Sequence, residues 1–135
     1  MKKEVSCGTI TFYKGKVLLI KQNKGYIGFP KGHVENGETE EETAIRETKE
    51  ETNIDVKIHK DKKYCINYDV DGKINKDVVL FLAEPISFET RKQDSEVEKT
   101  MWVDVSLVCD YLSYDDTKEI FMEALNDIEH LTKDN

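Results

Sequence analysis

The stretch GHVENGETEEETAIRETKEETNI, residues 32–54, decides the fold of this chain. Thr39 and Glu42 have the spacing of a capping box, in which the two residues cap the first turn of a helix reciprocally. From there to Thr52 the sequence contains good helix formers and neither proline nor glycine. Asn53 suits a left-handed stop at the C-terminus. The stretch therefore predicts a loop followed by one helix.

One face of the predicted helix is strongly acidic. At about 100° per residue, Glu47, Glu50 and Glu51 fall within one arc, so three like charges lie close together. Arg46 lies one turn before Glu50 and can pair with it, whereas Lys49 points to the other side. One arginine does not neutralise three carboxylates, and such oxygen ligands suit Mg²⁺ or Mn²⁺. The alternative is a glutamate-rich face that is merely solvated.

The loop before the helix carries groups that favour an anion. Residues 29–38, FPKGHVENGE, bring backbone groups to the positive end of the helix. Pro30 fixes one backbone angle, and Gly32 permits the close approach of a ligand or metal. Lys31 and His33 can reach phosphate oxygens and are the first candidate substrate-binding residues. The alternative is a solvated surface lysine and an ordinary loop histidine.

Together these positions resemble the Nudix box, G-x5-E-x7-R-E-U-x-E-E-x-G-U, in which U is aliphatic. Gly32, Glu38 and residues 46–54 have the required spacing, which fixes six charged or glycine positions. Two positions depart from the pattern. Thr48 replaces an aliphatic residue but keeps β-branched bulk for the core, and Asn53 replaces glycine in a left-handed stop that asparagine tolerates.

The resemblance implies a role for each matching residue. The groups that would bind Mg²⁺ or Mn²⁺, and so carry catalysis, are Glu47, Glu50 and Glu51, with the Gly32 carbonyl as a further ligand. Glu38 and Arg46 would form a structural ion pair that holds the loop against the helix, which leaves Arg46 not free to neutralise the acidic face. The bound cations would neutralise phosphoanhydride oxygens and lower the pKa of the attacking water.

A carboxylate outside the box is expected to assist. Glu96 lies six residues before Trp102, which opens a strand, and is our choice for a further catalytic and metal-binding residue. Glu98 is the competing candidate. Both can instead be solvated loop acids.

Within the family, the resemblance is closest to the asymmetric diadenosine tetraphosphate hydrolases. It rests on CGTI at residues 7–10, FPKGHVE at residues 29–35, and Glu96 before Trp102. Such an enzyme hydrolyses its substrate to ATP and AMP. Tyr68 matches an aromatic position that stacks an adenine there, and Lys76 falls near a phosphate-binding lysine. An ordinary strand aromatic is the alternative for Tyr68.

The box alone leaves other functions open. The same chemistry can sanitise oxidised nucleoside triphosphates or remove pyrophosphate from RNA 5′ ends, because substrate choice lies outside the box. The acidic balance weighs against RNA, and a pocket sized for a single nucleotide would favour the sanitising role. A ligand sensor without hydrolysis is a further alternative, but loss of activity usually removes box carboxylates and here none is missing.

The rest of the chain predicts an α/β (α+β) domain over residues 1–135. Strands are expected at residues 5–13, 17–20, 56–59, 64–70, 78–86 and 101–105. A final helix, capped by Asp115 or Asp116, has apolar residues at three-and-four spacing through Leu131 and should pack one face on a sheet. By resemblance this is a Nudix-type α/β/α sandwich, with a mixed β-sheet between helices.

Composition limits the partners. The net charge of −8 argues against binding nucleic acid through a broad basic surface, but divalent cations can bridge an acidic protein to a small-molecule nucleotide. Three isolated cysteines indicate reduced thiols in a cytoplasmic protein: Cys7, Cys65 and Cys109. No apolar stretch has the length of a signal segment or a membrane span, so no membrane partner is expected.

Overall fold

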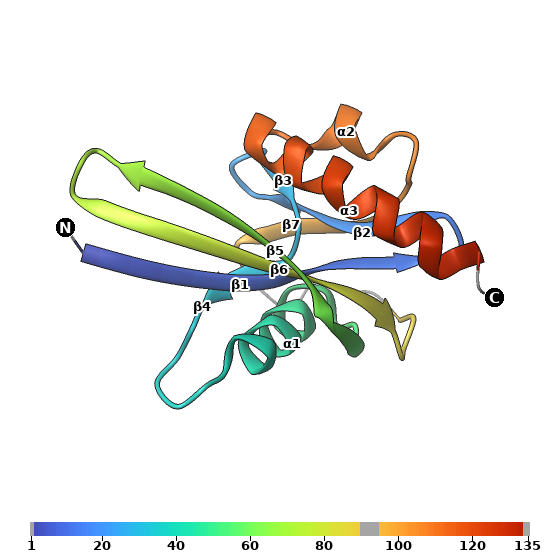
Figure 1. Cartoon of the computed structure of the whole chain (residues 1–135), viewed down its shortest axis with the longest axis horizontal. Coiled ribbons are helices and arrows are strands. Elements are labelled where there is room, and N and C mark those ends of the chain that lie inside the picture. Colours follow the sequence, from blue (N-terminus) through green and yellow to red (C-terminus); the bar gives the residue numbers. More distant parts are fainter. Residues whose placement is uncertain (1, 90–94, 134–135) are drawn as a thin grey trace.

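The computed structural model describes residues 2–89 and 95–133. Its elements are β1 (Lys2–Tyr13), β2 (Lys16–Gln22), β3 (Ile27–Gly28), β4 (Lys31–His33), α1 (Glu40–Thr52), β5 (Val56–Val70), β6 (Ile74–Pro85), β7 (Val97–Asp104), α2 (Val108–Tyr111) and α3 (Asp115–Lys133). In Figure 1, α1 covers one face of the sheet, and α2 and α3 lie on the other. The predicted α/β/α sandwich is confirmed.

The central strand of the sheet is β1. It pairs in parallel with β6, which brings the second half of the chain against the N-terminal strand. Its other edge pairs antiparallel with β4 over Ser6 to Gly8, and with β2 next to the turn that joins β1 to β2. β5 extends the sheet beyond β6, while β3 and β7 both pair with β2. The sheet is therefore mixed, as predicted.

Two predicted strands are in fact one. β5 runs without interruption from Val56 to Val70, where the sequence predicted separate strands at residues 56–59 and 64–70. The register against β6 shifts between Ile58 and Lys63, so residues 59–62, mostly charged, form an irregularity in the ladder and do not end it. An edge strand can carry charged side chains, because they face water and need no apolar partner. The lack of apolar residues in this segment had suggested a break between two strands.

Three short elements, β3, β4 and α2, were not predicted. β4 lies within residues 29–38, which were expected to be loop, and it forms by pairing with β1. A Cβ on Gly8 would lie only 1.9 Å from the carbonyl oxygen of Pro30, so glycine at this position lets the two segments approach. Since the pairing joins distant segments, no local pattern predicts it.

The two faces of the sheet carry separate cores, because strand side chains alternate with a period of two. On the α1 face, Cys7, Val79 and Phe81 pack with Ala44 of α1. On the other face a larger core joins the sheet to α3, and it includes Ile10, Leu80, Leu82, Ile120, Phe121, Ala124 and Ile128. The apolar stripe predicted for the final helix therefore does pack on the sheet. The same alternation turns neighbouring residues of β4 to opposite faces of the sheet.

The ends and the buried face of α1 agree with the sequence prediction. The capping box between Thr39 and Glu42 is present, and Asn53 adopts the left-handed conformation with φ of 66°. Thr48 faces the core, and its hydroxyl bonds to that of Thr9 at 2.8 Å, which in turn bonds to Thr11 at 2.8 Å. The threonine at this aliphatic position of the box is thus matched by a polar partner on β1.

The three cysteines are free thiols, as predicted. Burial raises the pKa of Cys7 to about 12, so this thiol stays protonated and unreactive at neutral pH. No described helix has the length and apolar character needed to cross a membrane.

Candidate functional site

β4 separates the two halves of the candidate site. Gly32, its middle residue, faces α1, where it lies directly against the Glu47 side chain. Lys31 and His33 flank Gly32 and so face the opposite side of the sheet, and Lys31 lines a cavity there. Three consecutive residues therefore connect the acidic helix to a pocket that lies across the sheet from it.

Two of the box glutamates are tightly packed against β4. Glu51 is only 6% exposed, and its carboxylate accepts a hydrogen bond of 2.8 Å from the backbone N–H of Lys31. The Glu47 side chain is 14% exposed, and a Cβ on Gly32 would lie 2.1 Å from its carboxyl carbon. Gly32 was expected to leave room for a ligand or metal, but here its missing side chain makes room for Glu47. Glu50 is half exposed.

Arg46 lies at the centre of the acidic groups. Its Nε donates to Glu38 at 2.6 Å and its Nη2 donates to the same carboxylate at 3.0 Å, so the ion pair between box loop and helix is present. Its Nη1 donates to Glu47 at 2.8 Å and to Glu50 at 3.3 Å. The expectation that Arg46 is not free to neutralise the acidic face is therefore wrong, because the planar guanidinium has enough N–H donors to bond both sides.

These contacts fix the charge of the ion pair. Hydrogen bonds from Arg46 and from the backbone N–H of Glu35 lower the pKa of Glu38 to about 2. The same contact with Glu38, followed by those with Glu47 and Glu50, raises the pKa of Arg46. Both groups are therefore fully charged at neutral pH, and the loop is held against α1 by a charge-assisted pair.

The donor set of the box fits a hard divalent cation in chemical type. Glu47, Glu50 and Glu51 provide carboxylate oxygens from one rigid helix, beside a backbone carbonyl of β4. In the described part of the chain, however, no three His, Cys, Asp or Glu side chains are already grouped as a metal site. Arg46 occupies oxygens of Glu47 and Glu50, so a bound cation would compete with this guanidinium for them.

The two candidate carboxylates outside the box differ in their surroundings. Glu96 is exposed on the turn before β7, and its carbonyl accepts a hydrogen bond of 2.8 Å from the N–H of Asn23. Glu98 lies within β7 and forms an ion pair of 3.2 Å with Lys21 of β2. β7, which follows Glu96 and contains Glu98, contacts the acidic helix α1. The ion pair with Lys21 engages the carboxylate of Glu98.

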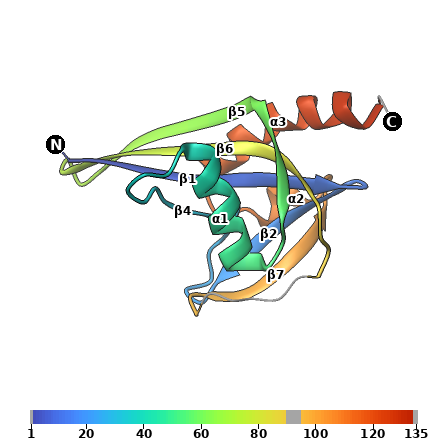
Figure 2. The same ribbon diagram turned by 90° about the horizontal axis from the view of Figure 1, so that it is seen from below.

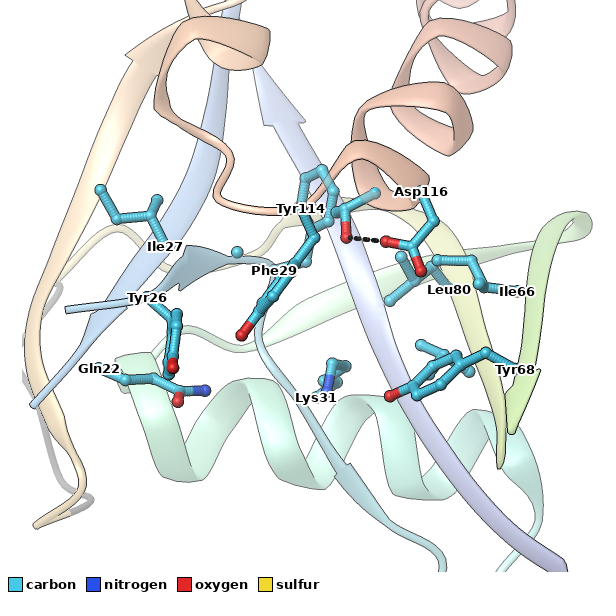
Figure 3. Close-up of a pocket in the computed structure, with 13 residues that line it drawn as sticks. Gln22, Tyr26, Ile27, Phe29, Lys31, Ile66, Tyr68, Leu80, Tyr114 and Asp116 are labelled. Carbon is cyan, nitrogen blue, oxygen red and sulfur yellow. Dashed lines mark hydrogen bonds between the residues drawn. The ribbon is translucent and has the colours of Figure 1, made fainter. Parts of the chain in front are cut away.

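A cavity of about 470 Å³ lies on the other side of the sheet. Figure 3 shows Lys31 and Tyr68 in its lower part and Asp116, from the start of α3, above them. Tyr26 and Tyr114 also line it, and their rings stack with centroids 5.4 Å apart. The remaining lining residues are Gln22, Ile27, Gly28, Phe29, Ile66, Val78, Leu80 and Thr117. The cavity is mostly aromatic and apolar, with a few polar groups.

Of the predicted substrate-binding residues, Lys31 and Tyr68 line the cavity, whereas His33 and Lys76 lie outside its lining. Lys76 is directly opposite Tyr68 in the β5–β6 ladder, so it adjoins the cavity. Sequence reasoning missed the residues from the other wall, among them Tyr26 and Tyr114. Each is an isolated loop tyrosine, and only the fold brings them together.

The cavity perturbs the charge of its lysine. Lys31 lines the cavity, and desolvation by the surrounding residues lowers its pKa. Glu51 opposes the shift, while the like charge of Lys76 adds to it. An anion entering the cavity would stabilise the charged form of Lys31.

Comparisons with known proteins agree with this geometry. The profile of the NUDIX domain family matches residues 2–125. Pig bis(5′-nucleosyl)-tetraphosphatase (asymmetrical) is 30% identical over 135 residues, covering 88% of this chain and 91% of the relative. The putative mutator protein MutT4 of Mycobacterium tuberculosis is 35% identical over 107 residues, covering 78% of this chain but 43% of that protein. A solved structure of Caenorhabditis elegans Ap4A hydrolase superposes with a TM-score of 0.84 and 26% identity, covering 94% of this chain and 98% of the other.

Proposed function

Because this chain belongs to the Nudix family and is a pyrophosphohydrolase, we propose that it hydrolyses diadenosine tetraphosphate to ATP and AMP in a metal-dependent reaction. The observation that carries the proposal is the position of Lys31. Its backbone N–H bonds to Glu51 of the acidic helix, and its side chain lines the aromatic cavity. One residue thus joins the candidate metal ligands to the candidate nucleoside pocket.

In this proposal the cavity binds one nucleoside of the substrate. A volume of about 470 Å³ lies within the range of small-molecule sites, roughly 300–1,000 Å³. The ring of Tyr68 forms one wall and the stacked rings of Tyr26 and Tyr114 form another, so a planar base can stack on either. Lys31, His33 and Lys76 would then contact the phosphates that lead away from the ribose.

The acidic helix supplies the reaction centre. Glu47, Glu50, Glu51, the Gly32 carbonyl and Glu96 would hold Mg²⁺ or Mn²⁺. When bound, the cation neutralises phosphate oxygens and lowers the pKa of the attacking water. Glu51 and Glu47 both contact β4, so their carboxylates are held at a fixed position relative to Lys31. The more exposed Glu96 would accept a proton from water, whose oxygen bonds to the phosphorus of one terminal AMP unit. The bridging P–O bond of that phosphorus then breaks, and ATP leaves with the bridging oxygen.

One observation favours a second substrate class. The described chain presents a cavity sized for one nucleoside, and a single-nucleotide pocket also suits an oxidised nucleoside triphosphate. The similarity to a putative mutator protein is consistent with this alternative. The site chemistry is unchanged in either case, and both substrates are small molecules of the cytoplasm, where we place the enzyme.

Product analysis tests the proposal. The protein with Mg²⁺ would be incubated separately with diadenosine tetraphosphate, oxidised dGTP and 5′-triphosphorylated RNA, and the products separated by chromatography. We expect fastest conversion of the first substrate to equimolar ATP and AMP. Preference for oxidised dGTP would assign the sanitising role, and absence of turnover on all three would refute the proposed activity.

A matched pair of variants tests the assignment of the assisting carboxylate. Glu96→Gln should lower turnover strongly, because the proton acceptor is lost, whereas Glu98→Gln should lose only the surface ion pair with Lys21. The reverse order of effects would transfer the role to Glu98.

A further inference from the structure

A short hairpin segment, residues 22–28, forms one wall of the cavity. It consists of the last residue of β2, the turn that follows and β3, and it contributes four lining residues: Gln22, Tyr26, Ile27 and Gly28. In Figure 3 the labelled residues of this segment lie on the left of the cavity, opposite Tyr68. A molecule bound in the cavity therefore contacts the hairpin segment directly.

Backbone hydrogen bonds make the hairpin segment a compact unit. The N–H of Gln22 donates to the carbonyl of Tyr26 at 2.8 Å, and the N–H of Gly25 donates to the carbonyl of Gln22 at 2.8 Å. Gly25 has φ of 94°, a conformation that glycine adopts without strain, so the turn is tight. Because these bonds close the turn, a contact that restricts Tyr26 also restricts the backbone at Asn23.

Asn23, within the same turn, holds the segment that precedes β7. Its backbone N–H donates to the carbonyl of Glu96 at 2.8 Å, and its side-chain Nδ2 donates to the carbonyl of Ser95 at 2.5 Å. The next residue, Val97, pairs with Gln22 of β2, and the ladder has a register shift at this point. Such irregularities often redirect the chain beside functional sites. The main chain at Glu96 is therefore attached to the wall of the cavity.

We propose that the hairpin segment couples nucleoside binding in the cavity to the position of Glu96, with Asn23 as the positioning residue. This inference rests on the proposed function, since it assumes a nucleoside in the cavity and a catalytic role for Glu96. A base packed against Tyr26 restricts the turn, and the two hydrogen bonds from Asn23 extend this restriction to the main chain at Ser95 and Glu96. The Glu96 carboxylate is thereby better ordered when the cavity is filled.

The coupling matters because Glu96 lies on an exposed turn. Ordering a glutamate side chain costs conformational entropy, and a reacting group must be held in a narrow range of positions. Hydrogen bonds that fix the main chain of Glu96 remove part of this cost. Asn23 is not among the residues that line the cavity, so it acts through Glu96 and not on the substrate.

Hydrogen–deuterium exchange with and without AMP tests the coupling independently of catalysis. The protein would be kept in EDTA, so that no metal-dependent reaction occurs. In the wild type, AMP should slow exchange in residues 22–28 and in residues 95–98. In Asn23→Ala, the effect on residues 95–98 should be largely lost, because the side-chain bond to Ser95 is absent. Asn126→Ala is the matched control, since this exposed asparagine of α3 lies outside the cavity lining and should leave both effects unchanged.

Kinetics test the consequence for turnover. Asn23→Ala should lower kcat for diadenosine tetraphosphate about tenfold, a smaller loss than the roughly 100-fold cost of misplacing a catalytic group by 1 Å. KM should stay unchanged, because the cavity lining is intact. In a Glu96→Gln background the same substitution should have no further effect on kcat, since the group that it positions is already lost. A merely structural role would lower Tm, and kcat in both backgrounds.

The outcomes separate this inference from the proposed function. AMP protection of residues 95–98 that depends on Asn23, with a loss of kcat only when Glu96 is present, supports the coupling. Protection confined to residues 22–28 in the wild type, or equal protection in wild type and Asn23→Ala, would overturn it even if the protein hydrolyses diadenosine tetraphosphate. Absence of protection in both segments would overturn it as well, and would also remove the nucleoside from the cavity.

Discussion

Replacing Gly32 by alanine is expected to displace the Glu47 carboxylate and to stop most turnover while the protein stays folded. The new Cβ would lie 2.1 Å from the carboxyl carbon of Glu47 and 2.3 and 2.4 Å from its oxygens. Ordinary van der Waals separation from a Cβ begins at 3.4 Å, so the carboxylate must retreat by about 1.3 Å. It cannot retreat freely, because Arg46 Nη1 donates to it at 2.8 Å.

The size of the effect follows from this displacement. A shift of about 1 Å in a catalytic group can cost on the order of 100-fold in rate, so we expect kcat to fall about 100-fold. Overpacking a filled site costs roughly 1–3 kcal/mol of unfolding free energy. Gly32 is not among the residues with positive φ, so the alanine adds no backbone strain. Loss of activity should therefore greatly exceed loss of stability.

Three measurements check this prediction: kcat with Mg²⁺, Mn²⁺ affinity by electron paramagnetic resonance, and Tm. Gly72→Ala is the control, because Gly72 has φ of 67° and open space around it. That variant should lower Tm through backbone strain and leave kcat unchanged. Wild-type kcat and Mn²⁺ affinity in Gly32→Ala would refute the reasoning that Glu47 is a metal ligand held in place by Gly32.

Three further predictions follow from named contacts. Glu51→Gln should fold, because the amide oxygen can still accept the Lys31 N–H, but should lose most of its turnover and Mn²⁺ affinity; near-normal values would remove Glu51 from the metal site. Tyr68→Ala should raise KM for diadenosine tetraphosphate more than for a nucleoside triphosphate, and equal effects in the two assays would exclude an adenine-stacking role. The pKa of Glu38 is lowered from 4.5 to about 2 by Arg46, so its contribution to stability is complete above pH 4.5 and disappears as the pH falls toward 2. Tm measured across this range should fall less steeply in Glu38→Gln than in wild type, and parallel slopes would contradict it.

The competition between Arg46 and a cation is a feature that the box pattern did not predict. The helix spacing predicted that Arg46 can pair with Glu50, whereas the family resemblance implied an ion pair with Glu38 that would keep the same arginine from the acidic face. In the fold, one edge of the guanidinium bonds Glu38 while Nη1 reaches Glu47 and Glu50. The difference arises because side-chain reach in three dimensions, and not sequence spacing, decides how many carboxylates one guanidinium contacts.

The substrate side of the site was only partly accessible to sequence reasoning. Lys31 was identified because it lies next to the box, and Tyr68 because it matches a family position. Tyr26 and Tyr114 come from separate loops with no periodic pattern, so nothing local marked them as walls of one cavity.

The sequence by itself determined the acidic helix, its caps, its family and the identity of the carboxylates, because these depend on local spacing and on helix periodicity. Tertiary structure decided the pairing of β1 with β4 and β6, and with it the separation of the candidate metal ligands and the aromatic cavity onto opposite faces of one sheet. Figure 2 shows the same arrangement from below, with α1 in front of the strands and α3 behind them. The physical reason is that strand pairing depends on distant partners, and a register shift by one residue would turn each side chain of β4 to the other face. In the observed register of β4 against β1, Lys31 lines the cavity and Gly32 lies against Glu47, and Gly8 permits the close approach of the two segments.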